Sequence, residues 1–144
     1  MRILVDGDSC PVIEIIVELA AASTIDLIVY TDLNHQHQLE YGVLKVVDQG
    51  FQSVDMLLCN NIEPEDIVIT SDYGLAALAL AKKAKVLSFS GREFTDQNIE
   101  MLLAKRHFQF KTRKRTGRQT SHQKRSELDD QRFQKGLTRL IENS

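Results

Sequence analysis

Residues 3–12 read Ile-Leu-Val-Asp-Gly-Asp-Ser-Cys-Pro-Val, and the expected architecture can be built outward from them. Three apolar residues in a row are typical of a short strand that is buried on both faces, as in a parallel sheet. Two aspartates follow closely, and Pro11 suits the first turn of a helix because its missing N–H is not needed there. The stretch therefore predicts a strand that ends in an acidic loop and leads into a helix.

The alternation of strand and helix continues along the rest of the chain. Apolar residues recur at helical spacing between short apolar runs, and Ser53 and Thr95 are suited to cap two of the helices. Strands that alternate with helices predict an α/β fold with a mostly parallel sheet covered on both faces. The expected strands are residues 3–5, 27–30, 43–47, 67–69 and 86–89, with a loop at 32–42 and a turn at 90–94. The expected helices are residues 12–22, 53–62, 75–83 and 127–142, and a further helix that starts at Thr95 and contains Ile99, Leu102 and Leu103.

Composition limits the protein classes that need to be considered. The chain has 144 residues, 42% apolar and 26% charged, so we expect one globular domain over residues 1–144. Two cysteines are too few for a disulfide framework, which indicates a reducing compartment. The longest apolar run, residues 75–81, is far shorter than the roughly 18 residues of a membrane span, and Asp6 interrupts any signal-peptide core. We therefore expect a cytoplasmic protein with no membrane partner.

Charge is divided unevenly between the two parts of the chain. Residues 1–104 carry six Lys/Arg against sixteen Asp/Glu, a net charge of −10, whereas residues 105–144 carry twelve against four, a net charge of +8. The basic segment at 105–126 interrupts the helical pattern and could be a mobile loop or a frayed helix end. Its charge favours either an anionic partner or a solvated loop that offsets the acidic body.

Aspartates follow several of the expected strands. Asp6 and Asp8 come after the first strand, Asp48 after the third and Asp72 after the fourth, while Asp55 lies in the first turn of a helix. Ligands of doubly wound sheets bind beyond the carboxyl ends of the strands, where the strand order reverses. Right-handed crossovers would make the first and fourth strands neighbours at such a reversal. We expect Asp6, Asp8 and Asp72 to converge there, with Asp55 leaning back toward the same edge.

Converging carboxylates raise one another's pKa unless a cation neutralises them, and oxygen ligands of this kind suit Mg²⁺ or Mn²⁺. The pattern therefore predicts a metal site made by Asp6, Asp8 and Asp72. Structural roles remain open for some of these acids: Asp8 could cap the first helix, Asp55 could be favoured by the helix dipole, and Asp48 could be an ordinary turn residue.

Two other reactive residue types carry weaker signals. His35 and His37 form a His-x-His motif in a polar loop, but no cysteine pair accompanies them, so we expect solvated side chains rather than a zinc site. Cys10 lies at a helix start, where thiolates are favoured, yet no histidine is placed in the sequence to activate it. We expect Cys10 not to be a nucleophile.

Further short motifs stand in a fixed order after residues 3–12. They are Gly50-Phe51, Val54-Asp55, residues 68–72 with Leu75-Ala76, residues 91–95 with Asn98-Ile99, and residues 130–133. This ordered set, which covers almost the whole chain, resembles the YaiI/YqxD family of small bacterial proteins. The resemblance implies a PIN-like (NYN-type) three-layer α/β/α domain with a five-stranded sheet, a fold associated with metal-dependent ribonucleases. PIN-like domains often pair, so the resemblance also suggests a homodimer.

The chain departs from the family pattern at two places. Members usually carry a lysine shortly after the Cys-Pro pair, where this chain has Ile13-Glu14. A lysine there would balance the charge of the acids, so its replacement argues against a charge-balancing partner beside them. The segment before the last helix is usually richer in Gly and Pro in the family, whereas here it is strongly basic, which is either a nucleic-acid contact of this lineage or has no role.

The leading functional hypothesis is metal-dependent phosphodiester hydrolysis of single-stranded RNA. Asp6, Asp8 and Asp72 would hold Mg²⁺ or Mn²⁺, and Asp6, Asp55 and Asp72 would form the catalytic set, with Asp55 as a further ligand or a water-orienting base. Positively charged side chains would hold the RNA backbone. The expected nucleic-acid-binding residues are Arg92, Arg113, Lys114, Arg115 and Arg118.

Two alternatives remain open. One is a nucleic-acid-binding or adaptor domain that has the same fold but no turnover. The other is a haloacid-dehalogenase-like phosphohydrolase, with Asp6 as nucleophile, Asp8 as acid/base and Lys82 or Lys83 as the lysine. The second alternative needs a late acidic pair after a strand, whereas Asp129-Asp130 precede a helix.

Overall fold

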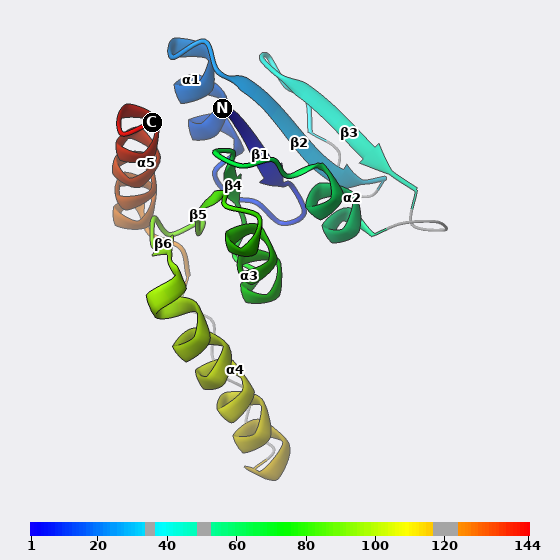
Figure 1. The fold of residues 1–144 in the computed structure, drawn as a ribbon, viewed down its shortest axis with the longest axis vertical. Coiled ribbons are helices and arrows are strands. Elements are labelled where there is room, and N and C mark those ends of the chain that lie inside the picture. Colours follow the sequence, from blue (N-terminus) through cyan, green and yellow to red (C-terminus); the bar gives the residue numbers. More distant parts are fainter. Residues whose placement is uncertain (34–36, 49–52, 117–123) are drawn as a thin grey trace.

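The protein is described by a computed structural model that covers residues 1–33, 37–48, 53–116 and 124–144, with residues 108–116 described by their backbone. Its centre is a six-stranded sheet with the order β3-β2-β1-β4-β5-β6 (Figure 1). All neighbouring strands are parallel except β5 and β6, which are antiparallel. The strands are β1 (Arg2–Asp6), β2 (Asp26–Asp32), β3 (Val43–Val47), β4 (Ile67–Ile69), β5 (Lys85–Leu87) and β6 (Glu93–Phe94).

The order of the strands reverses between β1 and β4. Ile3 pairs with Ile67 and Val5 pairs with Ile69, so the carboxyl ends of these two strands lie side by side. The expectation that the first and fourth strands are neighbours is confirmed. This junction places Asp6 and the residue after β4 at the same edge of the sheet.

One strand was not expected. Residues 90–94 were predicted as a turn, but Glu93 and Phe94 add the short strand β6 to the edge of the sheet. The turn before it is tight: the Gly91 amide donates to the Ser88 carbonyl at 3.1 Å, and the Ser88 amide donates to the Arg92 carbonyl at 2.8 Å. Two residues are too few to produce an alternating pattern, which is why the sequence indicated five strands instead of six.

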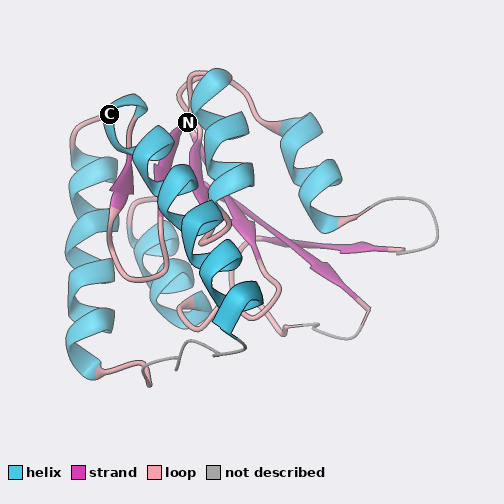
Figure 2. Ribbon diagram, turned by 90° about the horizontal axis from the view of Figure 1, so that it is seen from below, coloured by secondary structure: helices cyan, strands magenta, loops and turns pink. Residues whose placement is uncertain are grey.

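Helices cover both faces of the sheet, as predicted (Figure 2). Ile3 and Val5 face one core with α1 and α5, whereas Leu4 and Val68 face the other core with α2, α3 and the start of α4. This alternation is the two-sided burial expected of a parallel sheet. The helices are α1 (Ile13–Ala22), α2 (Val54–Asn61), α3 (Tyr73–Ala81), α4 (Asp96–Thr116) and α5 (Glu127–Glu142).

Both helix caps that the sequence predicts are present in the structure. The Ser53 side chain accepts a hydrogen bond from the Met56 amide at 3.1 Å, and Thr95 and Asn98 cap the start of α4 reciprocally. Two starts differ from the prediction. The first helix begins at Ile13, so Pro11 precedes it, and α3 begins at Tyr73 instead of residue 75.

The basic segment is partly helical. α4 continues from Asp96 to Thr116, so residues 105–116, for which a loop and a helix end were both open, extend this helix away from the sheet (Figure 1). Among the side chains of α4 that the structure describes, the buried ones are Ile99 and Leu102, in the first two turns. The final helix has the predicted bounds. No described helix is both long enough and apolar enough to cross a membrane.

Candidate functional site

Thr70 joins the two central strand ends. This residue follows β4 directly and is fully buried. Its hydroxyl donates a hydrogen bond to Asp6 Oδ2 at 3.0 Å and accepts one from the Asp72 amide at 3.1 Å. A single buried hydroxyl therefore orients the carboxylate at the end of β1 and the backbone of the aspartate after β4.

Asp6 lies in an environment that opposes its ionisation. Its side chain is partly buried, and its pKa is raised from 3.8 to about 6. Desolvation is the main cause of this rise in pKa; the charges of Asp55 and Asp8 add to it, and the hydrogen bond from Thr70 works in the opposite direction. Among the described residues, Asp6 takes part in no ion pair. A carboxylate in this position is a strong candidate for cation binding or proton transfer.

Asp8 is held in the loop between β1 and α1. Its Oδ1 accepts hydrogen bonds from the Thr31 hydroxyl and the Asp32 amide, both at 3.2 Å. α1 has no side-chain cap, so the alternative that Asp8 caps this helix was wrong. Next to it, Ser9 has a φ of +58°, a left-handed conformation that residues other than glycine seldom adopt.

Asp72 has a structural role that the sequence did not indicate. Its Oδ1 accepts a hydrogen bond from the Leu75 amide at 3.1 Å and thereby caps α3. The same oxygen lies 4.0 Å from Nη1 of the exposed Arg106 on α4. Arg106 therefore brings one basic side chain close to Asp72.

Asp55 completes the acidic set from the first turn of α2. Partial desolvation, followed by the charges of Asp72 and Asp8, raises its pKa. The four carboxylates of Asp6, Asp8, Asp55 and Asp72, here called the acidic cluster, are thus electrostatically coupled. Asp48 is exposed beyond β3 and is not among the acids that raise the pKa of Asp6 or Asp55.

The acidic cluster is not a closed metal cage. In the described part of the chain, no three His, Cys, Asp or Glu side chains are placed to hold one ion. The donor chemistry nevertheless suits Mg²⁺, which usually takes one or two carboxylates and completes its shell with water and substrate phosphate. The acidic cluster therefore fits an ion that is held by one or two carboxylates and by water better than an ion that is held by all three predicted aspartates.

His37 contributes a contact that sequence reasoning missed. Its Nε2 lies 2.9 Å from the carbonyl oxygen of Gly7, so this nitrogen donates to the backbone between Asp6 and Asp8. Only its polar loop and its His-x-His spacing marked it in the sequence, and neither indicates this contact. His35 lies outside the described residues. Nearby Cys10 is buried, which raises the pKa of its thiol to about 12, in keeping with the expectation that it is not a nucleophile.

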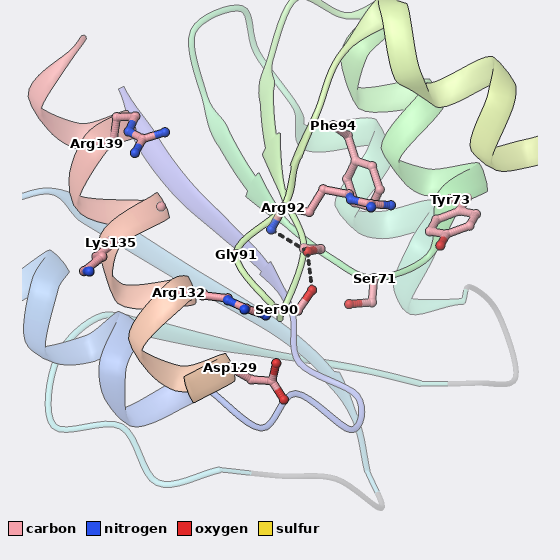
Figure 3. Close-up of a pocket in the computed structure, with 12 residues that line it drawn as sticks. Ser71, Tyr73, Ser90, Gly91, Arg92, Phe94, Asp129, Arg132, Lys135 and Arg139 are labelled. Atoms are coloured by element: carbon pink, nitrogen blue, oxygen red, sulfur yellow. Dashed lines mark hydrogen bonds between the residues drawn. The ribbon is translucent and has the colours of Figure 1, made fainter. Parts of the chain in front are cut away.

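The predicted nucleic-acid-binding residues fall in two separate places. Arg92 is exposed in the turn before β6 and lines a pocket of about 600 Å³ against α5 (Figure 3). Arg113, Lys114 and Arg115 belong to the far part of α4, where the structure describes the backbone, and Arg118 lies outside the described residues. No described contact joins Arg92 to the acidic cluster.

The residues of the dehalogenase-like alternative have other roles. Asp129 accepts a hydrogen bond from the Ser126 amide at 3.0 Å in the cap of α5, and Asp130 pairs with Arg125 at 2.7 Å. Lys82 donates to the Cys59 carbonyl at 2.6 Å, at the end of α3 remote from Asp72. These contacts do not support that alternative.

Comparison with known proteins places the chain in a family. The sequence profile described as "Uncharacterized BCR, YaiI/YqxD family" matches residues 4–143. Similar proteins include the UPF0178 protein of Natranaerobius thermophilus, with 45% identity over 98% of this chain and 96% of that protein. The UPF0178 protein of Clostridium tetani is 43% identical over 98% of this chain and 97% of its own length. The solved structure of Rae1 (YacP) from Bacillus subtilis aligns over 100% of both chains, with 19% identity and a TM-score of 0.46. On the strength of the profile match and these identities, the chain belongs to the YaiI/YqxD family.

Proposed function

We propose that this protein is a metal-dependent phosphodiesterase that cleaves single-stranded RNA at the acidic cluster. The observation that carries the proposal is the state of Asp6 at the junction of β1 and β4. Its pKa is raised to about 6, two further carboxylates act on it, and no described cation pairs with it. Carboxylates whose surroundings oppose ionisation cluster at catalytic and metal-binding sites.

Asp6 would hold Mg²⁺ or Mn²⁺, together with Asp8 or Asp72. The ion, when bound, would supply Lewis-acid stabilisation of the phosphate and a more acidic water. Thr70 keeps the Asp6 carboxylate oriented toward the sheet edge through its 3.0 Å hydrogen bond. Asp72 stays in place because its Oδ1 caps α3.

Asp55 is suited to act on the attacking water. Its pKa is raised by partial desolvation and by the charges of Asp72 and Asp8, which brings its basicity closer to neutral pH. Its position in the first turn of α2 points to a water-orienting or proton-accepting role. Arg106, which lies 4.0 Å from Asp72, would meet the phosphate backbone where α4 leaves the cluster.

The test combines metal binding with RNA cleavage. Calorimetry with Mn²⁺ and cleavage of a single-stranded RNA are measured on the wild type and on Asp6→Asn/Asp72→Asn. Asparagine also caps helices well, so the double variant should keep α3 intact. The matched control is Asp26→Asn, which removes an exposed acid at the opposite end of β2. Metal binding and cleavage should both disappear in the double variant and persist in the control.

A non-catalytic RNA-binding domain is the second candidate. It is favoured by the lack of a ready three-ligand metal group among the described residues. In that case RNA should bind equally well with Mn²⁺ or with a chelator, and no substrate should be cleaved. RNA binding of this kind in the wild type would replace the enzyme proposal.

A further inference from the structure

We propose that the pocket between α5 and the turn joining β5 to β6 binds a phosphate group of a nucleotide. This pocket, here called the basic pocket, has a volume of about 600 Å³, within the roughly 300–1,000 Å³ of typical ligand pockets. Four basic side chains and a single acid line it: Arg92, Arg132, Lys135 and Arg139, with Asp129. The inference deepens the proposed function, and its prediction that RNA binds in this pocket rests on that function.

The sequence of α5 builds one wall of the basic pocket. Arg132, Lys135 and Arg139 recur at intervals of three and four residues, so they share one face of the helix. Phe133 and Leu137 lie on the face that packs into the core, where both are fully buried. The basic face is thus fixed in place by the apolar face of the same helix. Figure 3 shows Arg132 extending from α5 toward Ser90.

A glycine contact sets the distance between the two walls. Gly91 has a φ of +89°, and a Cβ at this position would lie 2.5 Å from the carbonyl carbon of Arg132. Gly136 faces it from α5, where a Cβ would lie only 3.1 Å from the Gly91 carbonyl oxygen. Backbone therefore touches backbone here, which brings the turn that carries Arg92 close to the basic face of α5.

The positive charge of the basic pocket is not balanced within the described part of the chain. None of the four cations forms an ion pair there. Asp129 is engaged in the cap of α5, where hydrogen bonds from Ser126 lower its pKa; the charges of Arg125 and Arg132 also lower it, so this ionised acid offsets part of the positive charge. Four cations and one anion leave a net charge of +3 in a concave site. Such a site concentrates anions.

Hydroxyl groups add hydrogen-bonding capacity beside these cations. The buried Ser88 accepts from the Arg92 amide at 3.0 Å and shares a hydrogen bond with Ser90 at 3.1 Å (Figure 3). Ser71 lines the same pocket and is anchored by the Phe89 amide at 3.1 Å. Guanidinium groups with nearby hydroxyls are the donors that a phosphate oxygen prefers.

The position of the basic pocket points to a nucleotide. Ser71 and Tyr73, which line it, flank Asp72 of the acidic cluster. The half-buried Tyr73 ring is held edge-on to Phe94, with centroids 5.6 Å apart and planes at 71°. Aromatic rings of this kind support a base or sugar beside a bound phosphate. For an RNA strand bound at the acidic cluster, the basic pocket, which meets that cluster at Ser71 and Tyr73, would take the phosphate of another nucleotide of the same strand.

The first experiment tests the pocket without cleavage. Backbone amide shifts are followed by NMR while adenosine 5′-monophosphate, and separately adenosine, is added to the full chain in a chelator. The monophosphate should shift the amides of Ser90, Gly91 and Gly136 and adenosine should not. Equal responses to both compounds, or shifts confined to other residues, would overturn the proposal.

The second experiment uses single-stranded RNA, with and without a 5′-phosphate, bound in a chelator. Arg132→Gln should weaken binding about tenfold and flatten the slope of log affinity against log salt by about 0.7, the value for one phosphate contact on a single strand. The charge-matched control Lys83→Gln, an exposed site outside the pocket, should change neither. A loss restricted to the 5′-phosphorylated RNA would assign a terminal phosphate, and an equal loss with both RNAs would assign an internal one. Equal binding by both variants would overturn the proposal.

The two proposals fail in different ways. If Asp6→Asn abolishes cleavage while Arg132→Gln binds RNA like the wild type, the basic pocket is refuted and the acidic cluster stands. If the monophosphate occupies the pocket but no RNA is cleaved by the wild type, the pocket stands and the hydrolytic function is refuted. Thermal unfolding of each variant confirms that the exposed substitutions leave the fold intact.

Discussion

Replacing Asp6 by asparagine should stabilise the metal-free protein near neutral pH. The folded protein holds the Asp6 proton more tightly than the unfolded chain does, because the pKa rises from 3.8 to about 6. Ionisation therefore disfavours the fold. The stability that protonated Asp6 contributes to the fold is fully present below about pH 4 and is lost as the pH rises through about 6.

The magnitude follows from the size of the pKa change. About 1.4 kcal/mol for each pH unit over roughly two units sets an upper bound of about 3 kcal/mol. Asp6 is partly accessible to solvent, so screening reduces the expected gain to about 1–2 kcal/mol. Asparagine can still accept the Thr70 hydrogen bond, so the substitution removes the charge and keeps the contact.

Urea unfolding in a chelator measures this effect. The free energy of unfolding of Asp6→Asn and wild type is compared near pH 4 and near pH 7.5, with Asp26→Asn as the control. The free energy of unfolding of Asp6→Asn, relative to that of the wild type, should be higher near pH 7.5 than near pH 4. The same difference for Asp26→Asn should not change with pH. A difference between Asp6→Asn and wild type that does not change with pH would refute the reasoning about Asp6.

Three further predictions follow from the same contacts. Mn²⁺ should raise the unfolding midpoint of the wild type more than that of Asp6→Asn, because only the folded site binds the ion; equal shifts by calorimetry would contradict this. Thr70→Val should cost about 1–3 kcal/mol in urea unfolding, since it leaves Asp6 and the Asp72 amide without their shared hydroxyl, whereas Thr70→Ser should be much milder. Gly91→Ala should destabilise by about 1–3 kcal/mol, because its Cβ would meet the α5 backbone at 2.5 Å; an unchanged thermal midpoint would show that the turn can move away.

Elements with strong local signals were predicted well from the sequence. β1 and β4 are continuous apolar runs, and α5 has a regular apolar stripe, so their positions follow from local chemistry. β6 was missed because a two-residue strand exists only through its pairing with β5. The end of α4 stayed open in the sequence because its outer turns have no apolar periodicity to mark them as helix.

The acidic cluster was predictable in membership but not in detail. Positions after the strands identified Asp6, Asp8 and Asp72, because parallel topology brings strand ends together. The hydroxyl of Thr70, the His37 contact and the nearby charge of Arg106 come from residues distant in sequence, and no local pattern encodes them.

The basic pocket was not predicted, for the same kind of reason. Only Arg92 among its cations was singled out from the sequence, since it lies in a turn. Arg132, Lys135 and Arg139 look like the solvated face of an amphipathic helix until the close approach at Gly91 sets that face against the β5–β6 turn.

The most direct test of the central claim is the rate of Mn²⁺-dependent cleavage of a defined single-stranded RNA by wild type, Asp6→Asn and Asp26→Asn. The account predicts cleavage by the wild type and by Asp26→Asn, with a loss of about 100-fold or more in Asp6→Asn. Cleavage that is equally fast in Asp6→Asn, or that persists in the wild type after the metal is chelated, would contradict it.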